Sequence, residues 1–153
     1  MGEDEMLRRA LRLAVDPPGG VSIEALRALA RDDATEWDIA TTAKHLGVSP
    51  HTLRYYERIG LVQVARDAAG HRRYGAPAVR RLVFLTRMRT SGMPISDLRH
   101  YIDLVDSGQD TVSERMDLLL EHRDILRSRI AGLQLALAAT EYKIAVYQEV
   151  HQP

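Results

Sequence analysis

The most regular pattern of apolar positions lies in the last third of the sequence. From Met116 to Tyr147, positions of one seam recur at alternating spacings of three and four residues, and all of them are apolar except Arg123 and Thr140. This is the heptad pattern of a coiled coil, in which a long helix buries one apolar seam against a partner helix. It predicts a helix over residues 112–148, roughly 55 Å long at 1.5 Å per residue. We expect a homodimer held together by Met116, Leu119, Leu126, Ile130, Leu133, Leu137, Ile144 and Tyr147.

Shorter apolar repeats in the middle of the chain predict two helices joined by a tight turn. Thr41 or Thr42 is the expected N-cap of the first helix, and Gly47 supplies the turn that ends it. Ser49 is a favourable N-cap for the second helix. Pro50 suits the first helical position, where its missing N–H costs nothing.

The second helix has one apolar and one polar face. Leu53 and Tyr56 are three residues apart and can both face the first helix. The opposite face carries basic and aromatic side chains, which is typical of the second helix of a helix-turn-helix lying in the major groove of DNA. The candidate DNA-binding residues on this helix are His51, Thr52, Arg54, Tyr55 and Arg58.

A short hairpin is predicted directly after this helix. Val62 and Val64 alternate with a polar residue, residues 67–70 form a turn, and residues 71–74 form the return strand. A hairpin in this place is a wing, and its arginines would reach flanking phosphates or the minor groove. The candidate DNA-binding residues here are His71, Arg72, Arg73 and Tyr74, although Tyr74 could equally be a core aromatic.

The remaining periodic segments complete a mainly α fold. Residues 1–37 offer two short amphipathic helices that must dock on the chain or fray, and their role is unknown. Another helix follows Pro77, and a further one follows Pro94 until Ser107 and Gly108 break it. We therefore expect four parts: an N-terminal extension (1–37), a winged helix-turn-helix lobe (38–90), a hinge helix (91–110) and a coiled-coil dimerisation helix (111–150).

Charge is divided unevenly along the chain although its formal net charge is zero. Residues 39–90 carry ten basic side chains against only Glu57 and Asp67, whereas the flanking segments are each net −4. A basic block that coincides with a helix-turn-helix indicates a surface for nucleic-acid phosphates. The N-terminal segment could shield that surface when DNA is absent.

Composition excludes several classes of function. The chain of 153 residues has no Cys, which rules out disulfides, thiolate metal sites and thiol-based redox sensing. It has neither an apolar run of membrane-spanning length nor a signal peptide, so we expect a cytoplasmic protein. Nucleotide-binding and hydrolase motifs are also missing. We therefore expect no enzymatic activity, no cofactor and no metal.

Several motifs together resemble the MerR family of transcription regulators. They are Ser49-x-x-Thr52-Leu53-Arg54-Tyr55-Tyr56-Glu57, Gly60-Leu61, Gly70-x-Arg72-Arg73-Tyr74 and Ser91-Gly92-Met93-Pro94-Ile95. The resemblance covers residues 38–148 and is to a small, cysteine-free member without a large effector domain. It implies an antiparallel dimer on a pseudo-palindromic promoter site with an overlong spacer, which the dimer bends and untwists so that RNA polymerase can engage it. It also implies that Arg54, Tyr55 and Arg72 contact DNA.

Two questions stay open at this level. A small-molecule effector could be held by side chains such as Trp37, Tyr101, His122 and Tyr142, although ordinary packing explains each of them as well. The alternative to a sequence-specific regulator is an architectural or interaction protein. In that case the coiled coil would be the functional part, and the basic lobe would bind DNA without sequence preference.

Overall fold

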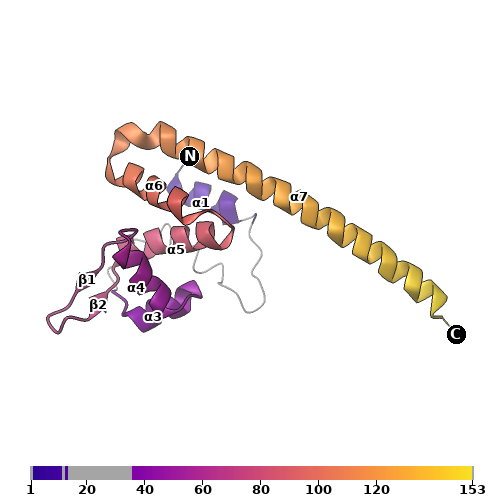
Figure 1. Cartoon of the computed structure of the whole chain (residues 1–153), viewed down its shortest axis with the longest axis horizontal. Coiled ribbons are helices and arrows are strands. Elements are labelled where there is room, and N and C mark those ends of the chain that lie inside the picture. The colour runs from indigo at the N-terminus through magenta and orange to yellow at the C-terminus, as the bar shows by residue number, and fades with distance from the viewer. Residues whose placement is uncertain (1, 12, 14–35, 153) are drawn as a thin grey trace. The chain divides into compact units, whose positions relative to one another are not determined.

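The structure, a computed structural model, describes residues 2–11, 13 and 36–152 of the chain. It is mainly α-helical with one small hairpin, as the sequence predicts (Figure 1). The chain divides into two compact units, one ending at Ile102 and the other beginning at Asp103. Within the described ranges, none of the helices combines the length and apolar character that a membrane-spanning segment needs.

The N-terminal helix predicted around Leu7 is present as α1 (Glu3–Leu11). An ion pair between Arg8 and Asp4, 2.7 Å apart, stabilises one exposed face of this helix. The second of the two helices predicted within residues 1–37 lies outside the described residues.

The helix-turn-helix consists of α3 (Ile39–Leu46) and α4 (Pro50–Arg58). Gly47 ends α3 in the left-handed conformation, with φ of 67°, and the Ser49 side chain accepts the Thr52 N–H at the start of α4. The predicted cap of α3 is wrong: the N-cap is Asp38, whose carboxylate accepts the Thr41 N–H at 2.8 Å. A carboxylate accepts this bond well because it also meets the positive end of the helix dipole.

The hairpin consists of β1 (Ala65–Arg66) and β2 (Arg72–Arg73), paired antiparallel. It is shorter than predicted and begins later, because Val62 is buried in the core and Val64 is packed against it, before the first strand. An isolated bridge joins Trp37 to Tyr74 and extends the pairing to the segment that precedes α3. We call residues 65–74 the wing.

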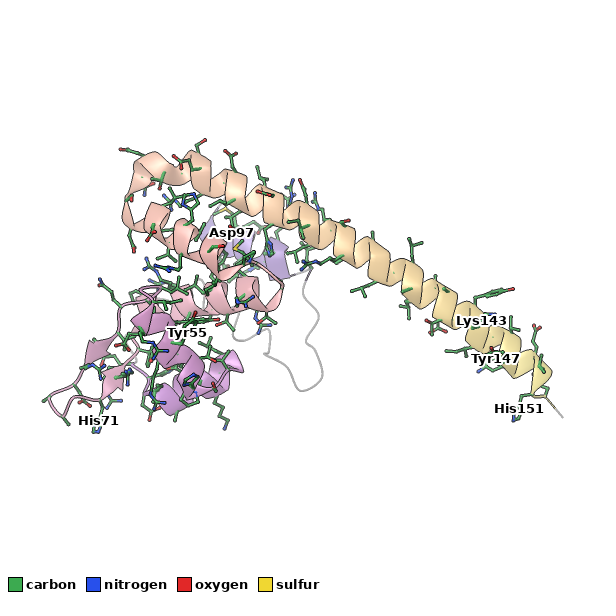
Figure 2. The ribbon with its side chains drawn as sticks, in the orientation of Figure 1. Tyr55, His71, Asp97, Lys143, Tyr147 and His151 are labelled. Carbon is green, nitrogen blue, oxygen red and sulfur yellow. The ribbon has the colours of Figure 1, made fainter. Side chains whose placement is uncertain are left out.

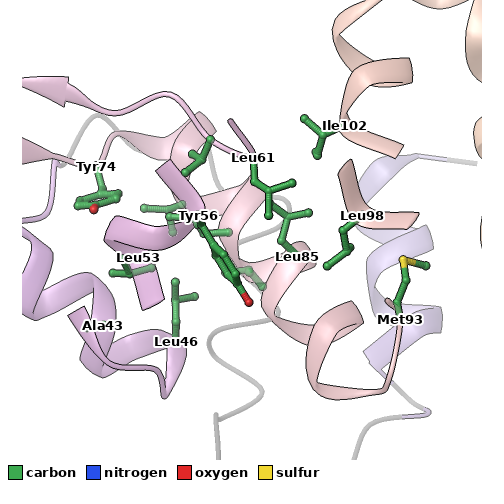
Figure 3. Close-up of a cluster of buried hydrophobic side chains, with 14 residues drawn as sticks. Ala43, Leu46, Leu53, Tyr56, Leu61, Tyr74, Leu85, Met93, Leu98 and Ile102 are labelled. Atoms are coloured by element: carbon green, nitrogen blue, oxygen red, sulfur yellow. The ribbon is translucent and has the colours of Figure 1, made fainter. Parts of the chain in front are cut away.

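The core of the first unit lies where α3, α4, α5 (Ala76–Thr90) and α6 (Ile95–Asp106) pack together. Figure 3 shows Leu53 and Tyr56 of α4 within this cluster, as their spacing predicts. Met88 is partly buried at the edge of this cluster. The fully buried members are Leu46, Leu53, Leu61, Tyr74, Leu82, Leu85, Leu98 and Val83.

The second unit is dominated by α7 (Val112–Val150), a helix of 39 residues that begins where the sequence predicts. A short 3-10 turn, η2 (Gln109–Thr111), leads into it after Gly108, which has a φ of 104°. The Thr111 hydroxyl donates to the carbonyl groups of Gly108 and Leu104, and these bonds close the corner before α7.

Candidate nucleic-acid interface

The outward face of α4 presents basic and aromatic side chains on a well-capped helix. Its side chains His51, Arg54, Tyr55 and Arg58 are exposed, whereas Thr52 is half-buried with its hydroxyl 3.1 Å from that of Ser49. The buried residues Leu53 and Tyr56 fix the rotation of the helix, so these four side chains are held away from the core.

Arg58 lies over the ring of Tyr55, with its guanidinium carbon 5.5 Å from the ring centroid. This cation–π contact limits the motion of both side chains at the exposed surface. Figure 2 shows Tyr55 on α4 and His71 near the tip of the wing, the two elements that supply the candidate DNA contacts. No ion pair or hydrogen bond joins the Arg54 side chain to another described residue, so its donors are available to a ligand.

The wing arginines are held by two carboxylates. Arg66 and Arg72 both donate to Glu57 of α4, at 3.2 and 2.7 Å, and Arg73 lies 3.5 Å from Asp67. Neither Arg66 nor the role of Glu57 could be predicted from the sequence, because no local signal pairs residues that lie nine and fifteen positions apart.

Asp67 shapes the turn of the wing. Its carboxylate accepts the backbone N–H groups of His71 and Ala69, at 2.9 and 3.0 Å, and Gly70 completes the turn with a φ of 84°. The bond from the His71 N–H is the main reason that the pKa of Asp67 lies below its usual range. The pKa of Asp38 is lowered in the same way by the Thr41 N–H.

The prediction that Tyr74 contacts DNA is wrong, because its side chain is fully buried. Backbone bonds to Trp37 hold Tyr74 against the core, and burial raises the pKa of its hydroxyl. His71 is exposed at the surface, and Arg72 and Arg73 are half-buried.

A cleft of about 390 Å³ lies between the start of α3, Arg54 of α4 and the wing. Four arginines and His71 line it, together with the carboxylates of Asp38 and Asp67. The arginines that line the cleft are Arg54, Arg66, Arg72 and Arg73. This concentration of cations, beside the exposed face of α4, is suited to a nucleic-acid phosphate.

Two of the four residues considered for an effector pack against aromatic side chains of the first unit. Trp37 stacks on His45, with ring centroids 4.4 Å apart, and Tyr101 packs against Phe84 at 5.2 Å. On α7, twenty positions separate the buried His122 from the exposed Tyr142, about 30 Å at 1.5 Å per residue. His122 and Tyr142 of one chain therefore do not belong to one site.

No cluster of three or more metal-ligating side chains occurs among the residues that the structure describes.

The seam predicted for dimerisation lies along α7 and is largely exposed in the single chain. Leu133 is 70% exposed and Leu137 is 60% exposed, whereas Leu119 and Leu126 are half-buried. Tyr147 projects from the last turns of this helix (Figure 2). The other seam residues, all exposed, are Met116, Ile130 and Ile144.

Two family models match most of the chain. The model for the MerR helix-turn-helix regulatory proteins matches residues 38–104, and the model for the MerR DNA-binding region matches residues 79–139. Together they begin at the cap of α3 and end within α7.

Relatives and solved structures agree with these models. An HTH-type transcriptional regulator of Haemophilus influenzae is 33% identical over 111 residues, which cover 72% of this chain and 82% of the relative. The regulator AdhR of Bacillus subtilis is 38% identical over 90 residues, which cover 58% of this chain and 64% of AdhR.

The crystal structure of HiNmlR, a MerR family regulator lacking the sensor domain and bound to promoter DNA, resembles this chain with a TM-score of 0.72. The two chains are 30% identical, and the match covers 78% of this chain and 98% of HiNmlR. All three of these relatives are named as regulators. With its helix-turn-helix, wing and long C-terminal helix, the chain belongs to the MerR family of DNA-binding transcription regulators.

Proposed function

We propose that the protein is a homodimer that binds a pseudo-palindromic promoter site with an overlong spacer and bends and untwists the DNA. The observation that carries this proposal is the exposed seam of α7, where Leu133 and Leu137 are more than half exposed in the single chain. Apolar residues in a heptad pattern, here interrupted only at Arg123 and Thr140, are expected to be buried against a partner helix. The chain would then divide into DNA-binding (38–90), hinge (91–110) and dimerisation (111–150) parts.

The dimer would present two copies of the α4 face and the wing to the DNA. His51, Arg54 and Tyr55 would face the major groove, and Thr52, Arg58 and the wing residues His71, Arg72 and Arg73 would lie beside the backbone. RNA polymerase would respond to the changed shape of the promoter rather than to direct contact. The protein would work in the cytoplasm, where the promoter is. A small-molecule effector stays a prediction.

The test is a footprint of the full-length protein on the DNA upstream of its own gene. The expected result is a protected pseudo-palindrome between promoter elements. Each mismatched base pair in that site should cost roughly 1–3 kcal/mol of binding free energy. Equal binding to unrelated duplexes would instead identify an architectural protein. A sedimentation mass of one chain under the same conditions would contradict the proposed dimer.

A further inference from the structure

The side chain of Glu57 joins α4 to both strands of the wing. It lies in the last turn of α4, and its two carboxylate oxygens accept bonds from different strands: Oε1 from Arg66 of β1 at 3.2 Å and Oε2 from Arg72 of β2 at 2.7 Å. The side chains of Glu57 and Arg72 are about one quarter exposed, at 24% and 25%. Partial burial and charge-assisted geometry make this pair more ordered than a fully exposed ion pair.

The two arginines use their donors differently. Arg66 gives one terminal nitrogen to Glu57 and the other to the Gly70 carbonyl at 3.1 Å, so its guanidinium is committed to the wing itself. Arg72 binds Glu57 through Nε, and neither of its Nη groups donates to another described residue. A guanidinium that is held through Nε can still donate from its two Nη groups to two oxygens of one phosphate.

We propose that Glu57 is a positioning residue for DNA binding, which fixes the Arg72 guanidinium so that its two Nη groups meet a backbone phosphate. This inference rests on the proposed use of the wing and α4 as the DNA-binding surface. Arg72 lines the cationic cleft beside Arg54, so its guanidinium is within reach of a ligand in that cleft. Glu57 itself does not touch the DNA.

Two opposing effects decide what loss of Glu57 does to affinity. Its charge repels the phosphate that Arg72 would bind, but screening by solvent and salt limits this to roughly a twofold loss of affinity. Without Glu57, the Arg72 side chain must be ordered when DNA binds, which costs about tenfold for a long, flexible side chain. Ordering is the larger effect. We expect Glu57→Ala to weaken binding about five- to tenfold despite the added net positive charge.

The experiment is a double-mutant cycle on the footprinted promoter fragment, with dissociation constants measured at one salt concentration. Glu57→Ala, Arg72→Ala and the double variant are compared, and circular dichroism checks that each is folded. If Glu57 acts through Arg72, its removal changes affinity less than about twofold once Arg72 is absent. Arg73→Ala is the control variant, because Arg73 pairs with Asp67 and not with Glu57. In a chain that carries Arg73→Ala, the added Glu57→Ala substitution should still weaken binding by its full amount.

Glu57→Gln keeps one acceptor oxygen but not the charge. It is expected to weaken binding measurably, by less than half of the binding free energy that Glu57→Ala loses, and it tests the proposal even if the alanine variant does not fold. Additive losses, or unchanged or tighter binding by Glu57→Ala or Glu57→Gln, would overturn the positioning role while leaving the proposed function intact. Failure of the unaltered protein to bind the fragment would contradict both the positioning role of Glu57 and the proposed function.

Discussion

The backbones of Trp37 and Tyr74 exchange two hydrogen bonds, in which the N–H of each residue donates to the carbonyl of the other, at 3.0 and 2.8 Å. The segment before α3 is thereby fastened to the end of the wing, and the Tyr74 ring is turned into the core. The Tyr74 hydroxyl is buried there without a hydrogen-bond partner in the described part of the chain.

Tyr74→Phe should therefore leave the free energy of unfolding unchanged or raise it by up to about 1 kcal/mol, because it removes an unsatisfied buried group and keeps the ring. Tyr74→Ala should lower it by about 3–5 kcal/mol, because it empties a packed site. Urea unfolding of both variants checks this. A loss above 1 kcal/mol in Tyr74→Phe would mean that the hydroxyl has a partner in solution.

The cap of α4 provides a second test. Ser49→Ala removes the side chain that accepts the Thr52 N–H, and should lower the free energy of unfolding by about 1 kcal/mol. Ser96→Ala is the matched control, since Ser96 is exposed within α6 and accepts no such bond from another described residue. Thermal unfolding of the two variants distinguishes them, and equal shifts would argue against the capping role.

The dimer can be tested with two leucines of α7 that are similarly exposed. Leu133 lies in the heptad seam and Leu135 lies on the opposite side of the helix, at 70% and 75% exposure. Leu133→Lys should cost the dimer about 1.5–3 kcal/mol of apolar burial per chain and shift the sedimentation mass toward one subunit. Leu135→Lys should leave the mass unchanged. Dissociation by both, or by neither, would contradict the proposed seam.

Base recognition and phosphate anchoring should separate between α4 and the wing. Arg54→Ala should relax sequence preference, with a loss of about 1–3 kcal/mol at the cognate site and less at mismatched sites. Arg72→Ala should weaken binding to all sequences and reduce the salt slope by about 1. Binding titrations at several salt concentrations, on matched and mismatched duplexes, measure both effects. Equal losses without a change in preference would refute this division.

The turn of the wing should contribute stability that depends on pH. The pKa of Asp67 lies below its ordinary value of 3.8 in the folded chain, mainly because the His71 N–H donates to it. Its contribution is therefore fully present above the unfolded pKa and is lost as the pH falls below 3.8 through the folded pKa. The difference in melting temperature between the unaltered chain and Asp67→Asn should be largest near neutral pH and should shrink below pH 4. A constant difference would contradict this.

Local signals in the sequence predict the helices well. Ser49, Pro50 and Gly47 act within one or two turns of the helices they bound, and their effects do not depend on the rest of the fold. The heptad pattern likewise needs only the periodicity of a helix, which is why α7 was predicted from Val112 onward.

The remaining features depend on contacts between distant residues. Tyr74 is buried because it pairs with Trp37, thirty-seven positions earlier, and Val62 is drawn into the core instead of forming a strand. Glu57 meets Arg72 only once the hairpin has folded against α4. The misassigned cap of α3 is a local error instead, because Asp38 stands directly before Ile39, the first residue of the helix, and accepts the Thr41 N–H.

The stacking of Trp37 on His45 gives the molecule an optical reporter of its own. Trp37 is the sole tryptophan of the chain, so intrinsic fluorescence originates at the junction between the wing and α3. The His45 ring covers one face of the indole, and detachment of the wing edge would expose the indole to water. Fluorescence at 295 nm excitation can therefore follow this junction during DNA binding without any added label.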